Sequence, residues 1–161
     1  MTAHPIRPRF AAIVLSLLAA GLLLSAPVPA WAVAWQPPWL TLVLAYWCLA
    51  QSDRIGVTAA TVLGVLQDAL TGTPLGQHAL AMAPVAAAVL GAHQRLRVLP
   101  LAQQALLLLP LLVMHQMVLA LVTGSTGRPV SVAMLAPALS GALVWPWLFL
   151  TLRDLRRRAG R

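Results

Sequence analysis

Long apolar runs separated by short, arginine-containing connections recur along the whole chain, and they constrain its fold more than any other feature. Of its 161 residues, 60% are hydrophobic and 9% are charged, whereas a soluble domain carries about 25% charged residues. The chain therefore has too little polar surface to cover a globule in water. Because such runs are typical of helices that cross a bilayer, we expect an all-α integral membrane protein with a single polytopic membrane domain.

Six of these runs are candidate transmembrane segments, which we expect to form one compact bundle. A helix needs about 20 residues to cross the hydrocarbon core of a bilayer, because it rises about 1.5 Å per residue. The expected segments are residues 10–31, 39–52, 55–70, 78–93, 99–123 and 132–152. The second, third and fourth are short, so tilting or local thinning of the bilayer has to make up their length. A bundle of five, with one short segment re-entrant or interfacial, stays open.

The arginines predict the orientation of these segments. Six alternating crossings place every arginine on one side of the membrane except Arg128. An excess of Lys and Arg in short loops marks the cytoplasmic side, so we expect both termini in the cytoplasm. Residues 153–161 would then form a basic cytoplasmic tail. It would either anchor the last segment to anionic lipid or dock to a cytoplasmic partner.

The first segment has two interpretations. The basic start "MTAHPIRPRF", the apolar run after it and the ending Ala30-Trp31-Ala32 are compatible with a cleavable signal peptide. Alternatively the segment is retained and continues into the interface through Trp35. We expect it to be retained.

Composition and spacing exclude several classes of function. The arginines lie in short clusters between apolar runs, whereas a nucleic-acid-binding protein gathers them into one patch or stripe. Metal sites need three or four converging ligands, and the expected segments place the histidines at different depths (His4, His78, His93 and His115). For the same reason no catalytic triad can be assembled. We therefore expect no enzymatic activity, cofactor, metal or nucleic acid.

A stripe of small residues runs along residues 55–70 and into the turn that follows, with the spacing of one helix face. Its members recur every four residues: Gly56, Ala60, Gly64, Asp68, Gly72 and Gly76. Such stripes let membrane helices approach closely. Because residues 78–93 are similarly small, we expect these two segments to pack together.

Asp68 is an acidic residue within an apolar run, just before a glycine- and proline-containing turn. An acid at the centre of a bilayer costs about 2.5–3.5 kcal/mol, and less near an interface, so Asp68 needs a partner or water. The turn at Thr71–Pro74 would fold His78 back toward it. We expect Asp68 to accept hydrogen bonds from turn amides or from His78 and so fix the hairpin. Two alternatives stay open: a polar substrate or proton site facing a cavity, and exposure to interfacial water.

A second polar pair lies in the middle of an apolar segment. His115 and Gln116 stand between Met114 and Met117, and buried polar side chains at such positions commonly form hydrogen bonds between helices. We expect them to bond across helices rather than bind a ligand.

Several stretches, taken in order, resemble the family of the rod shape-determining membrane protein MreD. They are the Tyr46-Trp47 pair, the spacing Gly64-x-x-x-Asp68-x-x-x-Gly72, then Leu75-Gly76 and Ala79-Leu80, and the later runs "LAQQALLLL" and "LVWPWLFLTLRDLRRR". The likeness covers residues 38–158. The chain departs from the family pattern at Gln67, Gln77 and His78, which are more polar. From the residues and this resemblance we take as structural or contact candidates Gly64, Asp68, Gly72, Gly76, His78, Trp145, Pro146 and Trp147.

The resemblance implies a non-enzymatic, multi-pass inner-membrane component of the machinery that elongates rod-shaped bacteria. In that family the protein works with MreC, and through it with MreB filaments and peptidoglycan synthases. The family is also distantly similar to the substrate-binding subunits of energy-coupling-factor transporters, which are compact six-helix bundles. A second possible function is therefore that of a subunit that binds a small, vitamin-like ligand, with Asp68, Gln77, His78, His115 and Gln116 facing its cavity.

Overall fold

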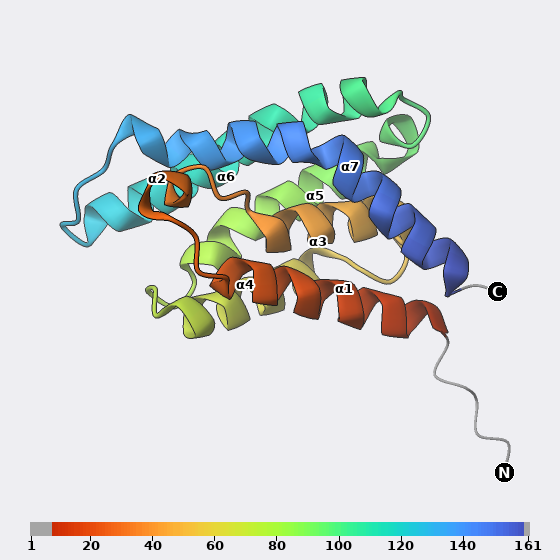
Figure 1. Cartoon of the computed structure of the whole chain (residues 1–161), viewed down its shortest axis with the longest axis horizontal. Helices are drawn as coiled ribbons and strands as arrows, with labels where there is room; N and C mark the ends of the chain where they lie inside the picture. Colours follow the sequence, from red (N-terminus) through yellow and green to blue (C-terminus); the bar gives the residue numbers. More distant parts are fainter. Residues whose placement is uncertain (1–7, 160–161) are drawn as a thin grey trace, which may run out of the picture.

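The computed structural model describes residues 8–159, and all regular elements in that range are helices. The expected all-α class is therefore confirmed. The chain runs up and down through a bundle, as Figure 1 shows. The elements are α1 (Pro8–Ser25), α2 (Ala30–Val33), α3 (Trp39–Ala50), α4 (Val57–Thr71), α5 (Gln77–Leu96), α6 (Leu101–Ser125), the 3₁₀ helix η1 (Val132–Leu135) and α7 (Ala136–Arg158).

The two ends of the bundle carry different connections. The start of α1 and the end of α7 lie at one end, together with connections 51–56 and 97–100 (Figure 1). Connections 72–76 and 126–131 lie at the opposite end, with α2. Successive long helices therefore run antiparallel to one another.

The first expected segment, residues 10–31, is not one helix. α1 ends at Ser25, and Trp31 belongs to the separate four-residue α2. Pro27 and Pro29 lie between them, and proline both lacks an amide proton and disfavours helical backbone in the residue before it. The side-chain amide of Gln36 donates to the carbonyls of Leu23 and Leu24, at 3.1 and 3.3 Å, and so satisfies the end of α1.

The helix boundaries near the carboxyl end also differ from those of the expected segment 132–152. Residues 132–135 form η1, and α7 continues without a break from Ala136 through Arg158. Leucine and arginine favour helix, and the arginines of the last turn interact favourably with the partial negative charge at a helix carboxyl end. Residues 153–158 of the expected basic tail are therefore helical and continue α7, whereas Gly160 and Arg161 lie outside the described residues. That this segment is a cytoplasmic tail stays a prediction.

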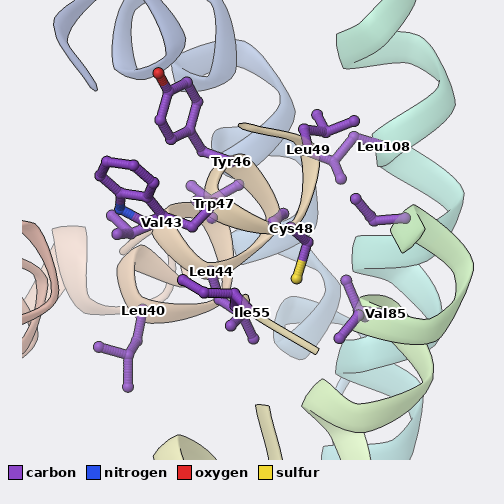
Figure 2. Packing of buried hydrophobic residues seen from close by; sticks show 14 of the residues in the cluster. Leu40, Val43, Leu44, Tyr46, Trp47, Cys48, Leu49, Ile55, Val85 and Leu108 are labelled. Carbon is purple, nitrogen blue, oxygen red and sulfur yellow. The ribbon is translucent and has the colours of Figure 1, made fainter. Parts of the chain in front are cut away.

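α3 is the centre of the bundle. Every residue from Leu40 to Leu49 is buried, and α3 packs against α1, α5 and α7. Figure 2 shows side chains of α3 directed to several sides of the helix. Val85 of α5 and Leu108 of α6 lie on one of these sides. The indole nitrogen of Trp47 donates to the Ser16 hydroxyl at 2.8 Å, which joins α3 to α1.

The outer helices present apolar side chains away from the core. Leu18 of α1, Leu66 of α4, Leu106 of α6 and Leu143 of α7 are all more than half exposed. Large apolar surfaces of this kind mark contact with a membrane or another protein. Among the described residues, two stretches are long and apolar enough to cross a membrane, Leu101–Ser125 and Val132–Arg158. The number of spanning helices beyond these two stays a prediction.

Candidate functional site

The turn between α4 and α5 reverses the chain within five residues. Gly72 and Gly76 have φ angles of +65° and +97°, in the left-handed region that glycine adopts without steric cost. The backbone amides of Gly72 and Thr73 both donate to the carbonyl of Asp68, which ends α4. The turn thereby brings the first residues of α5 back alongside the last turn of α4.

The side chain of Asp68 lies inside this hairpin and is completely buried. Its Oδ1 accepts hydrogen bonds from the Thr73 hydroxyl at 2.8 Å, from Nδ1 of His78 at 2.7 Å and from the His78 amide at 3.0 Å. Its Oδ2 accepts from the Gly76 amide at 2.8 Å. We call Asp68, Thr73, Gly76 and His78 the hairpin cluster. It provides hydrogen-bond partners for a buried carboxylate, which would otherwise be costly.

Gly64 allows the two helices of the hairpin to touch. A Cβ atom added to Gly64 would lie 2.4 Å from both the amide nitrogen and the Cα of Ala79. The backbones of α4 and α5 are therefore in direct contact at this position. Of the expected stripe, Ala60, Gly64 and Asp68 are buried, whereas Gly72 and Gly76 belong to the turn.

The hairpin cluster continues into two other helices. The rings of His78 and His115 lie with their centroids 6.5 Å apart, and Nε2 of His115 is 3.1 Å from the Thr41 hydroxyl. The expectation that these histidines lie at different depths is therefore wrong for this pair. His78 is the second residue of α5, whereas His115 lies well inside the longer α6. The two rings therefore lie at a similar level in the bundle, although His115 is farther from the end of its helix. His115 bonds across helices to α3, as expected.

No group of three or more His, Cys, Asp or Glu side chains within the described part of the chain is placed to hold a metal ion. The Nδ1 atom of His115 has no hydrogen-bond partner among these residues. The hydrogen bonds join α4 to α5 and α3 to α6 inside an apolar bundle, and the two pairs of helices meet where the rings of His78 and His115 lie close together.

The remaining candidates lie elsewhere, on α7. Trp145 is 1% exposed, and its indole nitrogen donates to Oε1 of Gln104 at 3.3 Å. The side-chain amide nitrogen of Gln104 in turn donates to the carbonyls of Leu96 and Leu99, at 3.0 and 3.1 Å. Trp147, beyond Pro146, is 63% exposed. The structure therefore divides the candidates into the α4–α5 hairpin and a separate tryptophan contact on α7.

Sequence reasoning missed Gln104 and Thr73. Gln104 links α7 to the connection between α5 and α6, and its only signal was a glutamine pair ahead of the apolar run "ALLLL". Thr73 was placed in the turn, but its hydroxyl was not expected to bond to the carboxylate of Asp68.

Comparison with known proteins identifies one family. A family model described as rod shape-determining protein MreD matches residues 6–155. The chain is 34% identical over 133 residues to the rod shape-determining protein MreD of Haemophilus influenzae, covering 80% of this chain and 82% of that protein. No solved structure matches the chain, so the likeness to energy-coupling-factor subunits stays a prediction. A family match of this extent, together with that relative, shows that the chain belongs to the MreD family of rod shape-determining proteins.

Proposed function

We propose that the protein is a multi-pass inner-membrane scaffold of the machinery that elongates rod-shaped cells, and that it catalyses no reaction itself. The observation that carries this proposal is the family match over residues 6–155. That match supports a role in determining rod shape. The hairpin cluster is compatible with a scaffold, because its polar groups bond to one another and hold helices in place.

The partners in this proposal are MreC and, through it, MreB filaments and peptidoglycan synthases. Among the described residues, the connections 51–56, 72–76, 97–100 and 126–131 are short, and residues 26–38, which include α2, form a longer one. A partner can therefore contact the apolar faces of the helices, the arginine-rich end of the bundle or residues 26–38. One such apolar face is a groove of about 450 Å³ bordered by α1, α3 and α7, with Leu15, Leu23 and Leu148 among its lining residues.

We propose six spanning helices, namely α1, α3, α4, α5, α6 and α7, with both termini in the cytoplasm. The distribution of charge supports this orientation. Arg128 lies in the connection at one end of the bundle, whereas the other described arginines lie in the first turn of α1, in or beside connections 51–56 and 97–100, or in the last turns of α7. The arginine-rich end is the one at which α1 begins and α7 ends.

The second possible function, binding of a vitamin-like ligand for a transporter, has weaker support. It relies on polar side chains that face a cavity, and four of its five candidates already bond inside the bundle. Asp68 and His78 bond to each other, His115 contacts Thr41, and the side-chain amide of Gln77 donates to the Thr123 hydroxyl. The family match favours shape determination.

Depletion of the protein tests the proposal. In a rod-shaped bacterium that carries this gene as its only copy, depletion should give rounded cells, and the full-length tagged protein should co-purify with MreC in a stoichiometric amount. The purified protein should leave lipid-linked cell-wall precursors unchanged. Turnover of such a precursor would refute the scaffold role, and normal rods with impaired vitamin uptake would favour the transport subunit.

A further inference from the structure

A basic cavity lies at the arginine-rich end of the bundle. Its volume is about 660 Å³, and it is formed by the end of α3, the connection after it, the residue after α5 and the last turns of α7. We call it the basic pocket. Its lining residues are Ala50, Gln51, Asp53, Arg54, Arg97, Arg156 and Arg157.

Two of its arginines are held in place by the carboxyl end of α3. Nε of Arg97 donates to the carbonyl of Leu49, and Nη1 of Arg156 donates to the carbonyl of Ala50 at 3.4 Å. The last carbonyls of a helix lack partners within the helix and carry partial negative charge. Each guanidinium has five N–H donors, so both arginines keep further donors for a ligand while α3 fixes their position.

The positive charge of the basic pocket is not neutralised by the protein. Within residues 8–159 the ion pairs are Asp68 with His78 and Arg153 with Asp154. None of the four pocket arginines is therefore paired with a carboxylate. Asp53 is the one acidic residue in the lining, so the pocket has a formal excess of three positive charges. Guanidinium groups match the oxygens of a phosphate in charge and in bidentate geometry.

An adjoining cavity is partly apolar. It has a volume of about 310 Å³ and shares Ala50, Arg97 and Arg156 with the basic pocket, while Tyr46, Leu49 and Phe149 complete its lining. The rings of Tyr46 and Phe149 meet edge to face with centroids 5.3 Å apart. Figure 2 shows the Tyr46 hydroxyl pointing away from the other labelled core residues. That hydroxyl is buried and has no hydrogen-bond partner among the described residues.

These observations define the chemistry of a ligand. It carries a phosphate-like anion for the four arginines and an apolar portion for the wall formed by Tyr46, Leu49 and Phe149. We propose that the basic pocket and the cavity beside it bind one anionic phospholipid, with its phosphodiester among Arg54, Arg97, Arg156 and Arg157. Anionic lipids are enriched at the cytoplasmic surface of membranes, where basic pockets between helices recognise their headgroups.

The test uses Arg54 and Arg157, because both are exposed and neither fixes the end of α3. Full-length protein in phosphatidylcholine nanodiscs is titrated with phosphatidylglycerol, and bound lipid is counted by native mass spectrometry. Since each of these two arginines would lose a hydrogen bond to the phosphodiester, worth about 1 kcal/mol net, the double variant Arg54→Gln/Arg157→Gln should bind about thirtyfold more weakly (about 2 kcal/mol at 1.4 kcal/mol per tenfold).

A matched control removes the same charge outside the basic pocket. Arg95 and Arg158 are exposed, lie at the same end of the bundle and do not line the pocket. Arg95→Gln/Arg158→Gln should therefore keep the affinity for phosphatidylglycerol within about twofold of the unmodified protein. An equal loss in both double variants, or no loss in either, would overturn the proposal, because a diffuse positive surface would then account for the attraction.

Two further comparisons identify the source of the anion. Inorganic phosphate should displace the long-chain lipid poorly because it has no apolar portion. Short-chain phosphatidylglycerol should displace it better than phosphate does but less well than long-chain phosphatidylglycerol, because its acyl chains are shorter. Displacement by phosphate at the same concentration as by lipid would overturn the assignment to a phospholipid. If the double variant fails to fold, as judged by thermal unfolding, Arg54→Gln alone should still weaken binding about fivefold, and unchanged binding would contradict the proposal.

Discussion

At the scale of single residues, Asp68 shows what a sequence can and cannot predict. Its position before a turn with two glycines and a proline predicted both the hairpin and the hydrogen-bond donors to its carboxylate. The Gly76 amide and His78 are among the groups that bond to it. All of these partners lie within ten residues along the chain. The contact of His115 with Thr41 spans 74 residues. It depends on how the helices are rotated and at what depth they lie, which no local pattern encodes.

We predict that Asp68 stabilises the hairpin. Asp68→Ala removes the acceptor for the Thr73 hydroxyl, the Gly76 amide and both donors of His78, and a buried donor without a partner costs about 1–3 kcal/mol. The free energy of unfolding should therefore fall by about 3 kcal/mol or more. Asp68→Asn keeps one acceptor oxygen and should lose less. Thermal unfolding of the detergent-extracted protein measures both, with cell shape scored in parallel.

One result would show that Asp68 has a role other than stabilising the hairpin. If Ala and Asn at position 68 both leave the unfolding temperature unchanged while the cells lose rod shape, Asp68 contacts a partner or ligand and the structural interpretation is wrong.

At the scale of elements, the small-residue stripe predicted the close packing of α4 on α5, but the ends of the helices followed other rules. Pro27 and Pro29 stop α1 earlier than the apolar run does. α7 continues to Arg158, beyond the expected end of the segment at Leu152, because its basic residues are good helix formers. Hydropathy therefore located the helices, whereas backbone chemistry decided where they end.

The contact between α4 and α5 predicts the effect of Gly64→Ala. The added methyl group would lie 2.4 Å from the backbone of Ala79, so the two helices have to move apart. Overpacking of this kind costs about 1–3 kcal/mol, and the unfolding temperature of the purified protein should fall.

Gly91→Ala serves as the control for this prediction. Gly91 lies in α5, and a Cβ atom there would meet nothing within 4 Å. Because alanine favours helix by about 1 kcal/mol over glycine, this variant should be neutral or slightly more stable. Similar unfolding temperatures for the two variants would show that the close packing of α4 on α5 does not limit the stability of the protein.

At the scale of the whole molecule, the sequence predicted a helical bundle but not which helix lies at its centre. Membrane helices are apolar on their outer faces as well as their inner ones, so composition does not separate α3 from the helices around it. α3 has 12 residues and is therefore about 18 Å long, well short of the hydrocarbon thickness of about 30 Å. It is enclosed by longer helices, which make up most of the bundle's outer surface.

The arrangement of the bundle predicts where its ends lie. A reporter fused after Gly160 should be active in the cytoplasm, and one inserted near Gly127 should be active in the periplasm, because the arginines gather at the end where α7 finishes. Paired alkaline phosphatase and fluorescent protein fusions measure this directly. A periplasmic carboxyl terminus would contradict the six-helix topology.

The local bonding of Asp68 also bears on how the chain enters a membrane during synthesis. α4 alone would present an unsatisfied carboxylate to lipid, whereas the chain extended through His78 carries every donor that this carboxylate uses. In the proposed six-helix topology, the favourable unit for transfer out of the translocation channel is therefore the paired α4 and α5, released sideways together. Partitioning of the acid into the bilayer then needs no help from α1, α3, α6 or α7, and these helices can assemble around a pair that is already closed.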